Sequence, residues 1–563
     1  MKHLKKTALF LMTVLTVCFI SCKEKKQKLN PELSSINLKR GELLLCSTES
    51  FGEVNFSLSC SYETRETFDL ALSLLHSFEY TEAEKAFVKV IDMDPDCAMA
   101  YWGVSMSIFQ SLWMQSDLSY LEKGNKLLKI ANKLPKSDLE KDYLDAINIY
   151  YKDWENIDKA TRKKMYEKKM EALYNRHKGD TEATVFYALA ILAAADPNDK
   201  SYTRQKKSGK ILEDLFTEKP NHPGIAHYII HNYDYPELAE KALPTARRYA
   251  EIAPASAHAQ HMPSHVFTRL GLWDESISSN INSASSANCY GKKVNPEATW
   301  GAEIHAVDYL VYAYLQNGNN QKANEYLLET QAITAVFPKQ NFASAYALTA
   351  IPVRIALENK QWENAANLKL PSIDFTWETL HWETAIMHFG KALGYSHTGN
   401  IEAAEKELQT LESLHQNLLN ANEEYKAKQV NVQVHSAKAW IEFAKENKEE
   451  ALVFMKKATY LENLTTKHPV TPGEVLPADE LLGDMLLALN QPKEALEAYE
   501  VNLKGHPNRF NGIYGAAVAS KKSGDQEKAL SYFKLLVKLS DNSNSDRIEL
   551  KEAKDFIKNN NLT

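Results

Sequence analysis

The chain has 563 residues, of which 44% are hydrophobic and 25% charged, and its formal net charge is −7 at pH 7. Acidic and basic residues are interspersed without a long basic block, which excludes nucleic acid as an expected partner. A chain of this length usually divides into several domains, unless a repeat array extends it in one dimension.

The first residues have the pattern of a secretory signal. Lys2, Lys5 and Lys6 precede an apolar run from about residue 9 to residue 20, which is too short to span a membrane as a mature helix. The run ends in Phe-Ile-Ser-Cys22, which resembles a bacterial lipobox with Phe where Leu is usual. We therefore expect lipidation of Cys22 after cleavage, with ordinary secretion and cleavage elsewhere as the alternative.

Export and anchoring have consequences for the rest of the chain. Loss of three signal lysines takes the net charge from −7 to −10. No other stretch of about 18 apolar residues occurs, so we expect membrane contact through the lipid anchor only and a location in the cell envelope. The Lys-rich segment 23–39 is expected to be a tether.

In an oxidising compartment, one disulfide among Cys46, Cys60 and Cys97 is an option, with small buried thiols as the alternative.

A repeated pattern follows along the mature chain. A small residue is followed by Ala after twelve positions, by an aromatic residue four positions later and, in two of three copies, by Pro after eight more. The copies are Ala71/Ala83/Phe87/Pro95, Gly483/Ala495/Tyr499/Pro507 and Ala517/Ala529/Phe533. The interval from Ala495 to Ala529 is 34 residues, which is the period of the tetratricopeptide (TPR) signature. Small residues allow two helices to approach closely, and the aromatic ring fills the gap to the next unit.

Weaker copies start near Pro223 and Ala257, and further second helices are expected around Ala323, Ala365, Ala404 and Ala451. We therefore predict an all-α TPR solenoid of antiparallel helix pairs. The expected division is a signal peptide (1–22), a tether and N-terminal segment (23–60), N-terminal repeats (61–220), His-rich central repeats (221–320), further repeats (321–464) and C-terminal repeats (465–563). Irregular insertions are expected near 196–203, 283–299 and 465–477.

Histidines are concentrated in the central repeats, where seven of the 17 in the whole chain lie between residues 222 and 308. The repeat frame, set by Ala and Pro positions, places eight side chains on the first helices at positions that face the groove in TPR proteins. They are His227, His231, Asp234, His258, His261, His265, His305 and Asp308. Spacings of three and four residues put the side chains of each helix on one face.

This set predicts a metal site, with two metal ions as an option and surplus residues as orienting groups, because imidazole is the commonest metal ligand in proteins. Zinc is expected first, with copper, iron and nickel as alternatives. A histidine–carboxylate hydrogen-bond network without metal is a second interpretation. Binding of an anionic or peptide ligand through partly protonated imidazoles is a third.

Two features near this set modify the prediction. Pro263 lies inside the helix expected to carry three of the histidines, so the helix either begins near Pro263 or is kinked there. Glu474, Glu480 and Asp484 form an acidic group that either complements the histidines across the groove or forms a solvated rim, and the rim is favoured. His222 is expected in a loop, and His76, His388 and His435 are expected in core packing.

Several segments together resemble a group of large bacterial TPR lipoproteins with a His-rich central part. They include Leu-His76-Ser-Phe, Asp-Pro95-Asp-Cys97-Ala-Met-Ala-Tyr-Trp-Gly and Pro-Gly473-Glu-Val-Leu-Pro-Ala, besides the histidine segments. The resemblance implies the solenoid fold and supplies no reaction and no catalytic residue.

Two functional hypotheses follow. The favoured one is an envelope-anchored scaffold or binding protein whose groove holds a metal ion, or a protein or peptide partner. The alternative is a metal-dependent hydrolase or oxidoreductase that uses the same His/Asp cluster. Phosphate-binding Gly-rich loops, Gly-x-Ser-x-Gly and His-Glu-x-x-His motifs are missing from the sequence, which weighs against the corresponding nucleotide, esterase and zinc-protease chemistry.

Overall fold

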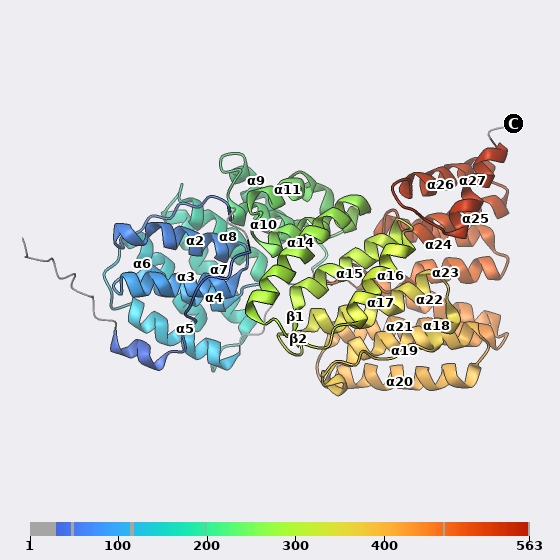
Figure 1. The fold of residues 1–563 in the computed structure, drawn as a ribbon, viewed down its shortest axis with the longest axis horizontal. Helices are drawn as coiled ribbons and strands as arrows, with labels where there is room; N and C mark the ends of the chain where they lie inside the picture. The colour runs from blue at the N-terminus through green and yellow to red at the C-terminus, as the bar shows by residue number, and fades with distance from the viewer. Residues whose placement is uncertain (1–29, 47–49, 113–116, 197–198, 466–467, 561–563) are drawn as a thin grey trace, which may run out of the picture.

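The protein is an all-α solenoid of antiparallel helix pairs, as the repeat pattern predicts (Figure 1). The computed structural model describes residues 30–46, 50–112, 117–196, 199–465 and 468–560. Cys22 and the apolar run lie outside these residues. Within the described ranges, no helix combines the length and the apolar character needed to cross a membrane.

The N-terminal part begins with a short turn and continues as consecutive helices. They are η1 (Pro31–Ser35), η2 (Tyr62–Thr64), α2 (Arg65–His76), α3 (Tyr80–Met93), α4 (Ala98–Phe109), α5 (Leu118–Ala131), α6 (Asp138–Tyr151), α7 (Lys159–Arg176), α8 (Thr181–Ala193) and α9 (Thr203–Phe216). The central part contains α10 (Pro223–Tyr233), α11 (Ala239–Ile252), α12 (Ala257–His261), α13 (Pro263–Leu270), α14 (Trp273–Val294), α15 (Gly301–Gln316) and α16 (Asn320–Gln331).

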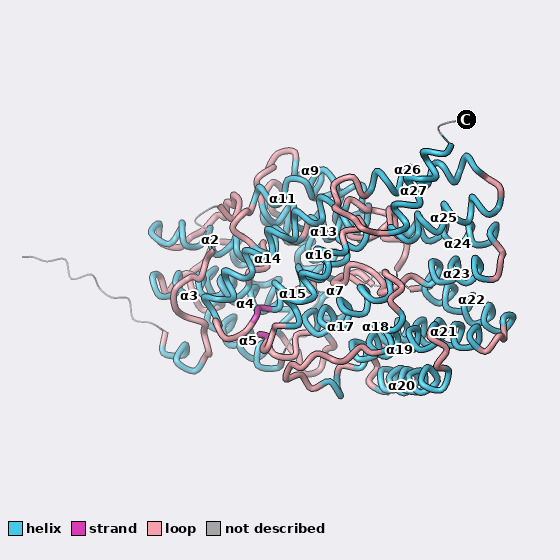
Figure 2. Tube along the Cα trace, turned by 45° about the vertical axis from the view of Figure 1, so that its right-hand side comes forward, coloured by secondary structure: helices cyan, strands magenta, loops and turns pink. Residues whose placement is uncertain are grey.

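The C-terminal part completes the array. It contains α17 (Phe342–Glu358), α18 (Trp362–Ala366), η3 (Trp377–Thr379), α19 (His381–His397), α20 (Ile401–Asn420), α21 (Glu424–Ala444), α22 (Lys448–Leu464), α23 (Ala478–Ala488), α24 (Pro492–Gly505), α25 (Phe510–Ser523), α26 (Gln526–Leu539) and α27 (Ile548–Asn560). Extended pairing in the described chain is limited to two short parallel strands, β1 (Thr299–Trp300) and β2 (Val336–Phe337), as Figure 2 shows.

The small and aromatic positions of the repeat pattern meet at the contacts between helices. The ring of Tyr499 in α24 lies between Gly483 of α23 and Gly515 of α25, and a Cβ added at Gly515 would lie 2.2 Å from that ring. The Phe87 ring lies in the same way over Gly103, at 2.3 Å from an added Cβ. Side chains larger than hydrogen are therefore excluded where the aromatic residue joins successive units.

A Gly515→Ala substitution should destabilise the C-terminal repeats by about 1–3 kcal/mol, because the new methyl group overpacks the contact with Tyr499. The matched control is Gly505→Ala in the neighbouring helix α24, where an added Cβ has no atom within 4 Å. That control should leave stability unchanged or raise it slightly. Urea unfolding followed by circular dichroism measures both changes, and equal effects of the two substitutions would contradict the packing argument.

Two segments differ from their predicted character. The insertion expected at 283–299 is helical as far as Val294, because α14 extends without interruption to that residue. The segment expected to be a tether is partly packed: Leu33 and Ile36 are buried, and the backbone N–H of Lys39 donates to Glu84 at 2.8 Å. The N-terminal segment therefore lies against the first helices from about residue 31 onward.

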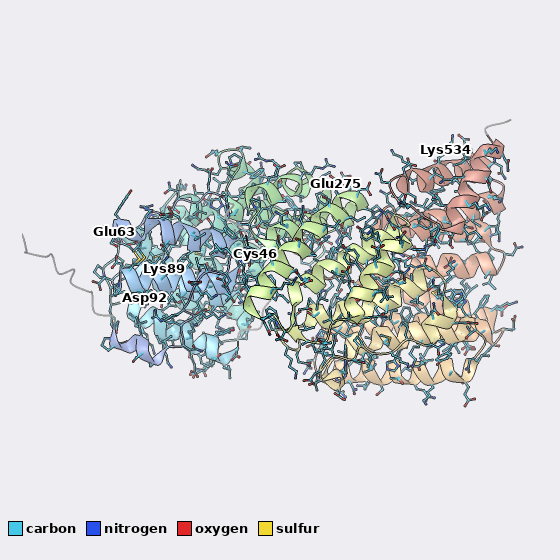
Figure 3. All side chains as sticks on the ribbon, viewed as in Figure 1. Cys46, Glu63, Lys89, Asp92, Glu275 and Lys534 are labelled. Carbon is cyan, nitrogen blue, oxygen red and sulfur yellow. A yellow bond between two sulfur atoms is a disulfide. The ribbon has the colours of Figure 1, made fainter. Side chains whose placement is uncertain are left out.

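Two disulfides hold this N-terminal segment. Cys60 pairs with Cys97, within the set considered from the sequence, and Cys46 pairs with Cys289 of α14. Figure 3 shows Cys46 beside the central helices, far from the labelled Glu63 at the N-terminal end of the array. The second disulfide was not predicted, because its two cysteines are 243 residues apart.

The insertion between α22 and α23 lies against the first helices of several repeat pairs. We call its residues 468–477 the groove loop. Arg269 of α13 donates to the carbonyls of Thr471 (3.2 Å) and Pro472 (2.8 Å). The hydroxyl of Tyr309 in α15 donates to the carbonyl of Val470 (3.2 Å), and Arg354 of α17 donates to that of Gly473 (3.0 Å). The protein's own chain therefore occupies the inner side of the central repeats.

A buried ion-pair network joins the C-terminal repeats to the central ones. Arg509, which is fully buried, donates to Glu480 at 2.9 Å and to Glu358 of α17 at 2.6 Å, and also to the Tyr312 hydroxyl of α15 at 3.1 Å. Glu480 is only 3% exposed, so the prediction of a solvated acidic rim is wrong for this residue. The curvature of the array brings α25 back onto α15 and α17, and this contact buries the carboxylate.

Candidate metal centre

The histidines are positioned by three successive inner helices. Helix α10 begins at Pro223, and His222 caps it by accepting the backbone N–H of Ile225. His227 and His231 follow one turn apart on its surface. Helix α12 ends at His261 and α13 begins at Pro263, so the helix breaks at Pro263 and His258 and His261 lie on the short helix before it. His305 lies on α15.

The six predicted histidines form two separate triads. The first triad is His227, His231 and His258, and the second triad is His261, His265 and His305. Within each triad, one ring nitrogen per histidine lies within 4.8 Å of the others. Each triad combines two histidines four residues apart with a third from a neighbouring helix. The structure thus brings together all six imidazoles that the repeat frame placed in the groove, at two points rather than one.

A hydrogen bond defines the proton position of His227 in the first triad. His227 Nδ1 lies 2.6 Å from the backbone carbonyl of His76, which only accepts, so Nδ1 carries the proton and Nε2 presents a lone pair. The Nε2 atoms of His231 and His258 both lie 3.0 Å from His227 Nε2. The single lone pair of His227 Nε2 can accept an N–H from one of these two rings but not from both. A metal ion bound by all three satisfies them, because ligands at about 2.0–2.1 Å in a tetrahedral site are about 3.3 Å apart.

In the second triad, hydrogen bonds fix the proton positions of two rings. His261 Nδ1 donates to Asn280 Oδ1 at 2.6 Å, and the amide of Asn280 is oriented by its own donation to the Ser276 carbonyl. His265 Nδ1 donates to Asp234 Oδ2 at 2.8 Å. Both Nε2 atoms therefore carry lone pairs, and they face each other at 3.0 Å. Two facing lone pairs repel unless a cation lies between them.

Burial of the triads disfavours a proton in the position between the facing Nε2 atoms. Burial lowers the pKa of His227, His231 and His258 well below the usual range. Burial, together with the neighbouring His265, lowers the pKa of His261 to about 3. These four rings are therefore neutral near pH 7, which is the form that binds metal.

Surrounding residues fix the orientation of the ligands. Asp234, predicted as a ligand, lies behind His265 and is held by Arg269, whose Nε donates to Asp234 Oδ1 at 3.3 Å. Burial raises the pKa of Asp234, but His265 and Arg269 outweigh it and hold the pKa below its usual value. The ring of Tyr309 stacks on His265 at 5.0 Å. Such outer groups set the tautomer and direction of a metal-binding imidazole.

The second predicted carboxylate, Asp308, also lies outside the triads. Asp308 is buried and forms an ion pair with Arg354 of α17, and it belongs to neither triad. Sequence reasoning could not identify its partner, which is 46 residues away. It also missed Phe78, whose ring lies 4.3 Å from that of His227 and stacks near His231 and His258.

A third group of possible ligands has a different character. His76, Glu182 and His222 are fully buried and close together. His222 accepts from Ile225 through Nδ1 and donates through Nε2 to Glu182 at 2.8 Å. His76 contacts the other Glu182 oxygen at 2.8 Å and the Tyr228 hydroxyl at 3.0 Å. Each polar atom here has a complementary partner, so the group is satisfied without metal. Its members are far apart in sequence, and no spacing signalled them.

Comparisons with known proteins identify no family for the chain. No family model matches it, and no curated protein sequence matches it. Similar solved structures include the APC/C hetero-tetramer Cut9-Hcn1, at 13% identity over 88% of this chain and 89% of that chain, with a TM-score of 0.29. The human IFIT1 dimer with m7Gppp-AAAA is 13% identical over 86% and 96%, with a TM-score of 0.35, and the dimer with PPP-AAAA gives 0.34. These low scores add no argument beyond the helix pairing described above.

Proposed function

We propose that the protein is an exported, envelope-anchored TPR binding protein that holds one divalent transition-metal ion in each histidine triad. The observation that carries this proposal is the second triad, where the Nδ1 atoms of His261 and His265 donate to protein acceptors and their unprotonated Nε2 atoms face each other at 3.0 Å. In the first triad, two Nε2 atoms converge at 3.0 Å on the unprotonated Nε2 of His227. Three neutral imidazoles per ion suit zinc first, and copper, nickel and iron as well. The two disulfides support an oxidising compartment, in keeping with the signal pattern that ends at Cys22.

A specific observation favours metal-dependent hydrolysis or oxidation as a second candidate function. Each triad offers three protein nitrogens, and a tetrahedral ion held by three ligands keeps a fourth position for water. His231, His258 and His305 are half-buried, so their side of each triad is not sealed. A water molecule on such an ion becomes a nucleophile near neutral pH.

The metal proposal predicts two ions per chain in protein purified without a polyhistidine tag. Elemental analysis after zinc loading and desalting measures the stoichiometry, and X-ray absorption measures the ligand number. Three nitrogens and one oxygen per ion would favour the catalytic candidate, and four protein ligands would favour a structural or storage role. Removal of metal by a chelator should lower the melting temperature, because the ion binds only the folded triads. A metal-free chain under zinc-replete conditions would overturn the proposal.

A further inference from the structure

The ligands of the two triads are all neutral, which leaves the charge of a bound ion uncancelled. Each triad consists of three histidines, and an imidazole binds metal in its uncharged form. A carboxylate or thiolate ligand would cancel one positive charge of the ion, but neither triad contains one. Two divalent ions, one in each triad, therefore bring four positive charges into the central repeats.

Carboxylates around the triads are mostly balanced by the protein's own cations. Asp234 accepts from Arg269 at 3.3 Å, and Asp308 forms a buried ion pair with Arg354. Glu79 accepts a side-chain hydroxyl at the start of α12 at 2.7 Å. Counted as ionised, Glu79 adds one negative charge. These groups together therefore oppose the four positive charges with at most one negative charge.

The exposed side of each triad gives a small anion access to the ion. His231 and His258 of the first triad and His305 of the second are half-buried, whereas the other three ligands are buried. A tetrahedral ion with three protein ligands keeps its fourth position for an outside ligand. Uncompensated charge in a buried place is strongly unfavourable, so a ligand that brings negative charge is favoured over neutral water at this position.

We propose that each loaded triad binds a phosphate group as a dianion, an inference that rests on the proposed metal function. A phosphate monoester carries about 1.5 to 2 negative charges at neutral pH, so one such group cancels most of the charge of one divalent ion. A carboxylate or a phosphodiester brings a single charge and cancels half. The arginines beside the triads are held by Asp234 and Asp308, so the ion itself supplies the attraction. The ligand class is inorganic phosphate or a small phosphate monoester.

Two phosphate esters of similar shape test the charge requirement. Methyl phosphate is a dianion at slightly alkaline pH, and dimethyl phosphate is a monoanion. Calorimetric titration of the zinc-loaded full chain should show two methyl phosphates per chain, bound at least about tenfold tighter than dimethyl phosphate. The chelated chain should bind neither ester. Inorganic phosphate is titrated in parallel, and the tighter of the two dianions identifies the form that the site prefers.

Metal content separates this result from that of the metal proposal. Elemental analysis of the same sample counts the ions before and after the titration. A chain with two ions that binds methyl phosphate no tighter than dimethyl phosphate, or that loses its ions to the esters, would overturn the phosphate proposal alone. A chain without metal under zinc-replete conditions would overturn both proposals.

Variants assign the phosphate to the triads. Asn280→Asp keeps an acceptor for His261 Nδ1 but adds a negative charge beside the second triad. It should keep two ions and weaken one of the two methyl phosphate sites about tenfold. The control is Asn282→Asp, which adds the same charge at an exposed position of the same helix and should leave both sites unchanged.

The number of bound phosphates should also follow the number of ions. His227→Ala, which retains only the ion of the second triad, should bind one methyl phosphate. Circular dichroism and metal content establish that each variant is folded. Two methyl phosphates on the His227→Ala chain, or unchanged binding by an Asn280→Asp chain that holds two ions, would place the anion elsewhere and contradict the proposal.

Discussion

Replacing His227 and His265 together by Ala should abolish metal binding, whereas each single substitution should reduce the metal content from two ions to one. His227 is the central ligand of the first triad, with two Nε2 atoms at 3.0 Å from its own, and His265 Nε2 faces that of His261 in the second. The loss of a direct ligand should cost more than the ~10–100-fold loss in affinity caused by removing an outer hydrogen-bond partner. Elemental analysis after zinc loading gives the stoichiometry of each variant.

Two controls separate metal binding from the general loss of a histidine or of a buried group. His388→Ala removes a half-buried histidine that pairs with Glu407 outside the triads, and it should keep two ions. Glu182→Gln perturbs the hydrogen-bonded group of His76 and His222, and it should lower stability while both ions remain. Two ions in the double variant, or loss of metal in the Glu182→Gln protein, would contradict the assignment of ligands.

Replacing Arg509 by Met should destabilise the protein by about 3–5 kcal/mol, because it leaves the carboxylates of Glu358 and Glu480 buried without a cation. Both acids are at most 3% exposed, and the arginine donates to each of them. The effect should be concentrated in the contact of α25 with α15 and α17. Urea unfolding of the full chain measures the change in free energy, and hydrogen exchange identifies the segments that open.

An exposed arginine provides the matched control for this prediction. Arg247 also pairs with a glutamate, Glu275, at 2.8 Å, but their side chains are 53% and 36% exposed. Arg247→Met should therefore change stability by less than about 1 kcal/mol. If both variants lose the same stability, the network around Arg509 does not join the repeats as described.

The fold was predictable because its determining contacts are local and periodic. Ala495 and Tyr499 recur 34 residues later as Ala529 and Phe533, and packing of rings on small residues explains the spacing. The inner face of each first helix followed from the same frame, and the structure brings His227, His231 and the other four histidines together in two triads.

Other parts of the site depend on contacts that the chain order does not reveal. His258 belongs to the first triad and His261 to the second, although both lie on the short helix α12 and are only three positions apart. In the sequence, Glu480 resembles an exposed acid. It is buried because the curvature of the array brings Arg509 against it. The group of His76, Glu182 and His222 joins three distant segments, which no helical period relates.

The groove loop has a consequence for partner recognition. Its carbonyls at Val470, Thr471 and Pro472 already take the hydrogen bonds that the inner helices offer to an extended chain. Because the loop is tethered at both ends, it competes at an effective concentration on the order of millimolar. A free peptide with the same contacts would need a similar concentration to displace it, so ordinary peptides are screened out of this stretch and only a ligand with additional affinity gains entry.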